Sequence, residues 1–339
     1  MIITTIEELR LSAPAHAIDS IDGLTGFIDN SEHDFLAEKL GRQLYESLCA
    51  WYQENKGHIS LTEDIDTGYY NRLLLLCQRC VAFDALGAAS GMQVVSVNNA
   101  GINQMAAEDY PAAPKESVDT YRQTCSKEAH KAVNRLLQTL EEWTKSVSST
   151  NTDSDSSSSG EDEMSEIVRL WKESRYFYLV ATLLIPSATV LQVYFDFYEN
   201  RERFIQMLPD LRYIQEEELE VRFGESIVAF FVKSQLEQTD NKCILRAIHL
   251  LRKAEAAGLE SRTNVLRTSD ARKKQAHDEM ERHLATATDY LIANAKDIWG
   301  EHLPVSPIFP DTENNQEPYE PQFKNNQKGN AIFVVPALD

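Results

Sequence analysis

The feature of this sequence that most constrains its fold is a helical pattern that occurs twice. One instance surrounds Gly41 and the other surrounds Gly224, and matching positions lie 183 residues apart. The matched positions are Phe27, Ile28, Leu36, Leu40, Gly41, Leu44 and Leu48 in the first instance, and Asp210, Leu211, Leu219, Phe223, Gly224, Ile227 and Phe231 in the second. Apolar residues at steps of three and four are typical of one buried helix face.

The match continues on both sides of these helices with small changes of offset. Ile3 to Thr5 corresponds to Ile185 to Ser187 at an offset of 182. Further segments correspond as Asn71–Gly87 with Asn241–Gly258 at 170 to 171, and as Ala129-His130 with Ala276-His277 at 147. The offsets change between elements and not within them, as in tandem domains whose loops differ in length. The sequence therefore predicts two related helical-bundle domains.

The first domain is predicted to span residues 1–150. It begins with a capping box, Thr5 followed by Glu8, and continues with one long helix that passes through Gly41. Further predicted helices cover 66–89 and 116–145, and between them a small β-hairpin covers 92–105. The fold class is therefore mainly α, with a hairpin or loop projection.

Three further segments complete the predicted organisation. Residues 151–164 form an acidic, serine-rich linker without apolar residues in its first part. Residues 165–300 form the second domain, with helices at 200–235, 240–257 and 270–299 and a shorter projection at 261–266. Residues 301–339 hold six of the eleven prolines, which favours an extended C-terminal arm.

Apolar side chains on the hairpin and on the arm are the predicted partner contacts. They are Val95, Val97, Ile102, Phe323, Ile332, Phe333, Val334 and Val335. An extended apolar arm has no core of its own, so it packs on its own domain or adds a strand to a neighbour.

Charge and cysteine content narrow the function classes. The net charge of -20 argues against attraction to nucleic acid or an anionic membrane as the main binding force. Five cysteines are too few for a disulfide scaffold and indicate reduced thiols in a protein made inside a cell. We also expect no cleaved signal and no membrane span, because no segment has eighteen uninterrupted apolar residues.

Four clusters could carry chemistry, and each has a plainer structural interpretation. Cys77-x-x-Cys80 lies in an apolar helical run and is interpreted as buried core cysteine. The histidines of the 277–283 segment are six residues apart, whereas a zinc helix needs a spacing of four, so an exposed helix face is favoured. Glu32-His33-Asp34 is also interpreted as an exposed face, and 153–163 as linker and not a calcium loop. We therefore expect no enzyme activity, no metal and no cofactor.

An aromatic cluster at 171–198 leaves two interpretations open. It holds Trp171, Tyr176, Phe177, Tyr178, Tyr194, Phe195, Phe197 and Tyr198. Packing in the core is the first interpretation, and a face that anchors a protein partner is the second.

Several segments resemble an uncharacterised family found in phages and prophages of Bacteroidetes. They are Met1–Arg10, Phe27–Leu36, Gly41 with Leu44-Tyr45, and Gln322–Asn326. The chain also resembles, more loosely, the helical head-tail connector proteins of tailed phages. This resemblance implies a virion structural protein, made in the bacterial cytoplasm, that forms a ring, commonly twelvefold, below the portal protein. Its partners would be further copies of itself, the portal and tail or other connector proteins, with DNA passing nearby.

Two features depart from the usual connector, namely the second domain in the same chain and the acidic linker. The alternative function is a monomeric tandem helical scaffold that binds a protein partner through its aromatic second domain.

Overall fold

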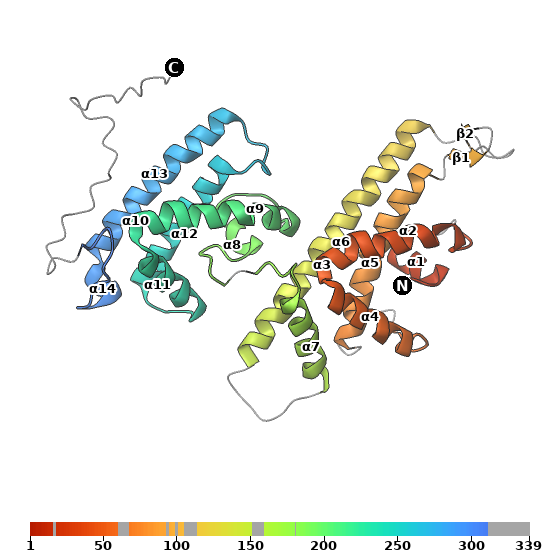
Figure 1. Cartoon of the computed structure of the whole chain (residues 1–339), viewed down its shortest axis with the longest axis horizontal. Coiled ribbons are helices and arrows are strands. Elements are labelled where there is room, and N and C mark those ends of the chain that lie inside the picture. The colour runs from red at the N-terminus through yellow and green to blue at the C-terminus, as the bar shows by residue number, and fades with distance from the viewer. Residues whose placement is uncertain are drawn as a thin grey trace, which may run out of the picture. The chain divides into compact units, whose positions relative to one another are not determined.

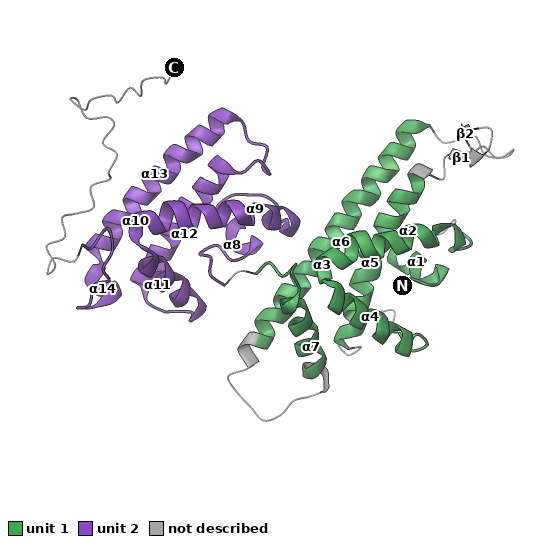
Figure 2. Cartoon of the chain, viewed as in Figure 1, with its two compact units in different colours: residues 1–179 green, residues 180–339 purple. Residues whose placement is uncertain are grey.

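The computed structural model describes residues 1–15, 18–59, 68–92, 95–98, 101–104, 114–150, 159–179 and 181–310. The chain is mainly α-helical, as predicted, and forms two compact units, Met1–Leu179 and Val180–Asp339 (Figure 2). The predicted contacts Phe323 and Ile332 to Val335 lie outside the described residues, as does 151–158 of the predicted linker.

Unit 1 contains a series of helices and one hairpin (Figure 1). In chain order they are α1 (Ile6–Ser12), η1 (Asp22–Leu24), α2 (Thr25–Asn30), the π-helix η2 (Ser31–Leu36), α3 (Ala37–Leu40), α4 (Arg42–Asn55), α5 (Tyr69–Met92), β1 (Val95–Asn98), β2 (Gly101–Gln104), α6 (Lys115–Thr150) and α7 (Ser159–Glu173). The predicted capping box is confirmed, because Thr5 accepts from the Glu8 N–H and the Glu8 carboxylate accepts from the Thr5 N–H.

Helix α5 is the centre of unit 1. It contacts α1, α2, η2, α4, α6 and α7, and its leucines Leu73, Leu74 and Leu76 are buried. Residues Tyr69–Ser90 are long and apolar enough to cross a membrane, but 72% of their most apolar window is buried inside the unit. The sequence pattern is thus that of a core helix. Gly87 lets α6 approach closely, since a Cβ there would meet that of Cys125 at 3.2 Å.

The predicted hairpin is present between α5 and α6. β1 and β2 pair antiparallel with Val97 opposite Ile102 and Val95 opposite Gln104. The backbone of three predicted contacts, Val95, Val97 and Ile102, is thereby placed on one hairpin.

Unit 2 is built from a similar series. It consists of α8 (Ala188–Gln192), α9 (Arg201–Ile214), the π-helix η4 (Gln215–Glu220), α10 (Val221–Phe223), α11 (Glu225–Leu236), α12 (Lys242–Arg262), α13 (Asp270–Ala293) and α14 (Ala295–Trp299). Helices α12 and α13 pack along each other, as α5 and α6 do in unit 1. Of the projection predicted at 261–266, residues 261–262 end α12, and residues 263–266 begin the loop that leads to α13.

The boundary between the units differs from the prediction. Residues 159–164, expected in the linker, begin α7, and 165–173, expected in the second domain, continue it. Helix α7 packs on α4, α5 and α6, with Met164, Ile167, Val168 and Trp171 buried, so it completes unit 1. The first turn of α7 is acidic, like the predicted linker, so its composition does not indicate the helix with a buried apolar stripe that begins there.

The long helix predicted through Gly41 is broken there, and the corresponding helix is broken at Gly224. The two glycines have φ of 86° and 94° with ψ of 150° and 141°. This conformation ends a helix and is readily available only to glycine. A six-residue π-helix precedes each break, η2 in unit 1 and η4 in unit 2.

The chain entry of each unit is held by the π-helix in the same way. The Ile2 N–H donates to Glu32 Oε1 at 2.8 Å, and the Leu184 N–H donates to Gln215 Oε1 at 3.0 Å. Glu32 and Gln215 are both buried and lie 183 residues apart. The offset of 183 residues found in the sequence therefore also separates the two side chains that make these equivalent hydrogen bonds.

Candidate interaction site

In each unit a later segment of the chain packs on the glycine that separates a short helix from a long one. This glycine is Gly41, between α3 and α4, in unit 1 and Gly224, between α10 and α11, in unit 2. We call this packing the closing contact. A Cβ added to Gly41 would meet Ser174 Oγ at 2.1 Å, and one added to Gly224 would meet Ser306 Cβ at 3.2 Å and Pro307 Cδ at 3.3 Å. At Gly41 only a residue without a side chain leaves room for the serine, and at Gly224 a Cβ would force the neighbouring atoms to shift by a few tenths of an ångström.

A short turn follows the serine in both units. The Phe177 N–H donates to the Ser174 carbonyl at 3.0 Å, and the Phe309 N–H donates to the Ser306 carbonyl at 3.0 Å. The Phe177 ring packs edge-on against Trp171 at 5.0 Å between centroids, and the Phe309 ring packs against Trp299 at 5.4 Å. The chain therefore leaves each unit from a fixed position.

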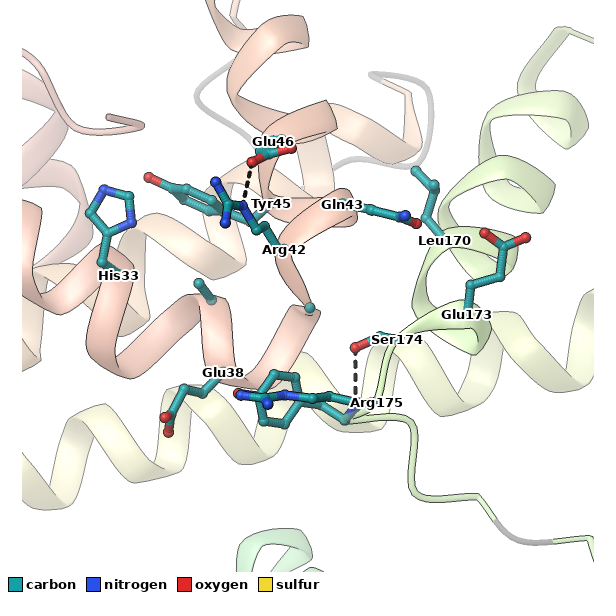
Figure 3. A pocket seen from close by; sticks show the side chains of 13 residues that line it. His33, Glu38, Arg42, Gln43, Tyr45, Glu46, Leu170, Glu173, Ser174 and Arg175 are labelled. Atoms are coloured by element: carbon teal, nitrogen blue, oxygen red, sulfur yellow. Dashed lines mark hydrogen bonds and ion pairs between the residues drawn. The ribbon is translucent and has the colours of Figure 1, made fainter.

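A cavity of about 770 Å³ opens beside this contact in unit 1 (Figure 3). It is lined by η2, α3, the start of α4 and the end of α7, and by Gly41 and Ser174. Its charged side chains are His33, Glu38, Arg42, Glu46, Glu173 and Arg175.

The cations of this cavity already have partners. Arg42 pairs with Glu46 at 2.7 Å, and this hydrogen bond raises the pKa of the Arg42 guanidinium. Both side chains are exposed, so the pair adds little stability. The Arg175 guanidinium lies 4.7 Å from the Tyr176 ring centroid and donates to the Tyr176 hydroxyl. Mixed charge and aromatic surface suit a polar protein segment better than a single ion.

The serine and the histidine of the cavity do not form a nucleophile and base pair in the described part of the chain. The Ser174 hydroxyl accepts from the Tyr176 N–H at 3.1 Å. His33 instead lies 3.7 Å from Asp29 on its own helix. The described residues also contain no group of three His, Cys, Asp or Glu side chains placed to hold a metal ion.

The interpretation of Glu32-His33-Asp34 as an exposed face is wrong for Glu32. This carboxylate is fully buried and accepts from the Tyr45 hydroxyl at 2.6 Å. Burial, together with the contact to Glu32, raises the pKa of Tyr45. The wider turn of the π-helix directs Glu32 inward, which a spacing rule for α-helices does not anticipate.

The cysteine interpretation is confirmed. Cys77 and Cys80 are both buried in α5, and burial raises the pKa of the Cys77 thiol well above its ordinary value. A buried neutral thiol is a core residue and a poor nucleophile. Of the two histidines predicted on an exposed face, His277 is exposed and His283 is half-buried.

The aromatic cluster is only partly buried and is divided between the units. Trp171, Tyr178 and Phe197 are buried, and the first two lie in unit 1 and not in the second domain. Tyr176, Phe177, Tyr194 and Phe195 are half-buried. Tyr198 is the exposed member, since it is 83% exposed, and it has a φ of 62°.

Sequence reasoning missed the closing contact and the cavity beside it. A signal was present, because Ser174-Arg175-Tyr176-Phe177 and Ser306-Pro307-Ile308-Phe309 share serine and phenylalanine at the same spacing. The predicted domain boundaries place the first tetrapeptide in the second domain and the second in the arm, which conceals their equivalence.

One family model matches part of the chain. Residues 36–158 match a family of unknown function, DUF6712. The match starts at the end of η2, covers α3 to α6, and stops before α7. No curated protein and no solved structure matches the chain.

Proposed function

We propose that this chain is a virion structural protein of a tailed bacteriophage, a head-tail connector that forms a ring below the portal and joins head to tail. The observation that carries the proposal is the closing contact at Gly41 and Gly224. It fixes where the chain leaves each unit, and a ring subunit needs rigid bodies with arms that start from defined positions.

The proposal includes a common origin of the two units. Both have a π-helix, a glycine break, a buried side chain that holds the entering backbone, and a serine that closes the unit. The two copies would contribute different contacts to the ring. The hairpin with Val95, Val97 and Ile102 is present in unit 1, and the arm residues Phe323 and Ile332 to Val335 come near the end of the sequence of unit 2.

Mass photometry of the purified chain, alone and mixed with the portal protein of the same particle, tests this function. A connector gives a ring mass or adds an integral number of copies to the portal ring. A chain that stays monomeric and leaves the portal mass unchanged would contradict the proposal.

The second candidate is a monomeric scaffold that binds a protein partner, and Tyr198 favours it. The Tyr198 N–H donates to Asp196, and the neighbouring Phe197 and Glu199 N–H groups donate to Gln192, so this loop holds an exposed aromatic ring in place. A partner captured by the wild type and lost in Tyr198→Ala, with no ring formed, would support this candidate.

A further inference from the structure

Unit 2 carries a basic stripe on the outer face of α12. The stripe consists of Lys242, Arg246, His249 and Lys253, spaced four, three and four residues apart, so all four point the same way. Lys242 and Arg246 are exposed, and His249 and Lys253 are half-exposed. In the described part of the chain, none of the Lys and Arg residues of the stripe has an ion-pair partner.

The cations of the stripe act on the histidines near them. Burial and the nearby cations Lys253, Arg246 and Arg252 lower the pKa of His249. Burial and Lys253 likewise lower the pKa of His283, on α13. Glu279, the acid that acts on His283, pairs with Arg272 at 3.3 Å.

Unit 2 also carries an acidic patch on and after η4. Its members are Glu216, Glu217, Glu218, Glu220 and Glu225. Burial, and the negative charges of Glu225 and Glu216, raise the pKa of Glu220. Among the described residues, the patch has no cation within ion-pair distance, because Arg222 turns away to Glu281 at 3.3 Å.

The basic stripe and the helix that carries the patch lie on different sides of α12. Ile214, next to η4, packs on α12 at Gly258, where a Cβ would lie 3.0 Å from the isoleucine side chain. At about 100° per residue, Gly258 lies about 160° around α12 from Lys242. Helix α12 thus has η4 on one side and the basic stripe on the other.

We propose that the basic stripe of one copy docks on the acidic patch of the next copy, so that copies of this chain associate head to tail. This inference rests on the proposed ring and assigns its subunit contact. A two-fold dimer through either surface would bring like charges together, which costs free energy. Two different, complementary surfaces make a heterologous contact, and such a contact closes into a ring when the rotation between successive copies allows it.

Unit 1 does not share this charge pattern. The positions that correspond to Arg246 and Glu217 are Leu76 and Asp34, and the acidic run of η4 is replaced by the mixed sequence Glu32 to Lys39. The proposed contact therefore uses unit 2 alone.

Charge reversal in the full-length chain tests the contact. One variant reverses the stripe (K242E, R246E, K253E) and another reverses the patch (E216K, E217K, E218K). Light scattering of each variant alone should show an association at least about tenfold weaker than that of the wild type, because like charges then meet. A 1:1 mixture of the two variants should restore it, since each reversed surface finds its complement on the other variant.

The matched control reverses three exposed lysines of unit 1 (K115E, K127E, K172E) and changes the net charge by the same amount as the stripe variant. It should associate like the wild type, and circular dichroism should show the same helix content in all variants. If both charge-reversed variants associate as strongly as the wild type, the proposed contact is overturned but the proposed ring is not. A monomeric wild type would overturn the ring and the contact together, and duplex DNA binding lost only in the stripe variant would identify a nucleic-acid surface instead.

Discussion

One carboxylate position illustrates how the two units differ at the residue scale. In unit 1 Asp84 accepts from the Ser31 hydroxyl at 2.6 Å. The corresponding residues of unit 2 are Glu255 and Ile214, at offsets of 171 and 183. Isoleucine cannot donate, and among the described residues Glu255 has no hydrogen-bond partner for either oxygen although it is fully buried. Burial raises the pKa of this carboxyl to about 8.

Glu255 should therefore make unit 2 less stable as the pH rises. Its folded pKa of about 8 lies above the ordinary value of 4.5, so the folded state keeps a proton that the unfolded state releases. The stability that this carboxyl contributes is fully present below its ordinary pKa of 4.5 and is lost as the pH rises through its folded pKa of about 8. The Glu255→Gln variant lacks this loss. Between the two pKa values, its free energy of unfolding relative to that of the wild type should rise by up to ~1 kcal/mol per pH unit.

Hydrogen exchange of the α12 amides between pH 5 and pH 9, corrected for the intrinsic exchange rate, measures this effect in unit 2 alone. Glu237→Gln, an exposed neighbour of Lys233, is the control and should follow the wild type. An equal pH slope in Glu255→Gln and wild type would show that the buried carboxyl does not titrate in this range.

At the scale of elements, the break between α3 and α4 decides the shape of unit 1. Gly41 combines a φ of 86° with a contact that leaves no space for a Cβ. The indole N–H of Trp171 donates to the Lys39 carbonyl at 3.3 Å, so α7 is bound to the same junction. The arrangement of α3, α4 and α7 thus depends on Gly41.

Gly41→Ala should destabilise unit 1 strongly. The left-handed backbone alone costs about 1–3 kcal/mol for a residue with a side chain, and the Ser174 collision adds to it. Thermal unfolding followed by tryptophan fluorescence should show a lower midpoint. Gly26→Ala is the matched control, since no atom lies within 4 Å of its Cβ position inside α2, and it should be neutral or stabilising.

The helices themselves could be predicted from the sequence, and their interruptions could not. The apolar steps around Leu44 and Leu73 and the capping box at Thr5 are local signals, and helices form there. The π-helices and the burial of Glu32 depend on contacts with Ile2 and Tyr45, which are distant in sequence. The closing contacts of Ser174 and Ser306 depend on tertiary packing against a glycine more than eighty residues away. The spacing of apolar residues along the sequence carries no information on such distant contacts.

At the scale of the whole molecule, the turn around Phe309 completes the packing of unit 2. Phe309 packs on Trp299, which also contacts Phe230 and Phe231. Ser306 of the same turn is buried, so this turn is part of the packed unit. The arm residues Phe323 and Ile332 to Val335 come later in the sequence and are the proposed contacts with other copies.

Two truncations should separate these roles. A chain that ends at Pro310 keeps the closing turn, so α11 and α12 should exchange hydrogen as slowly as in the full chain, while ring formation weakens. A chain that ends at Gly300 lacks Ser306 and Phe309 and should exchange faster throughout unit 2. Equal ring formation by the full chain and the Pro310 truncation would exclude the C-terminal arm as a subunit contact.

The closing serines also set an order of events during synthesis. Each unit is completed by its last-made segment, because Ser174 and Ser306 reach back to glycines that left the ribosome more than eighty residues earlier. Unit 1 can fold fully only after Phe177 emerges, when the first residues of unit 2 are already inside the exit tunnel. The nascent chain therefore carries the two incomplete bundles in succession and not at once, which limits the time in which helices of one can pair with the other.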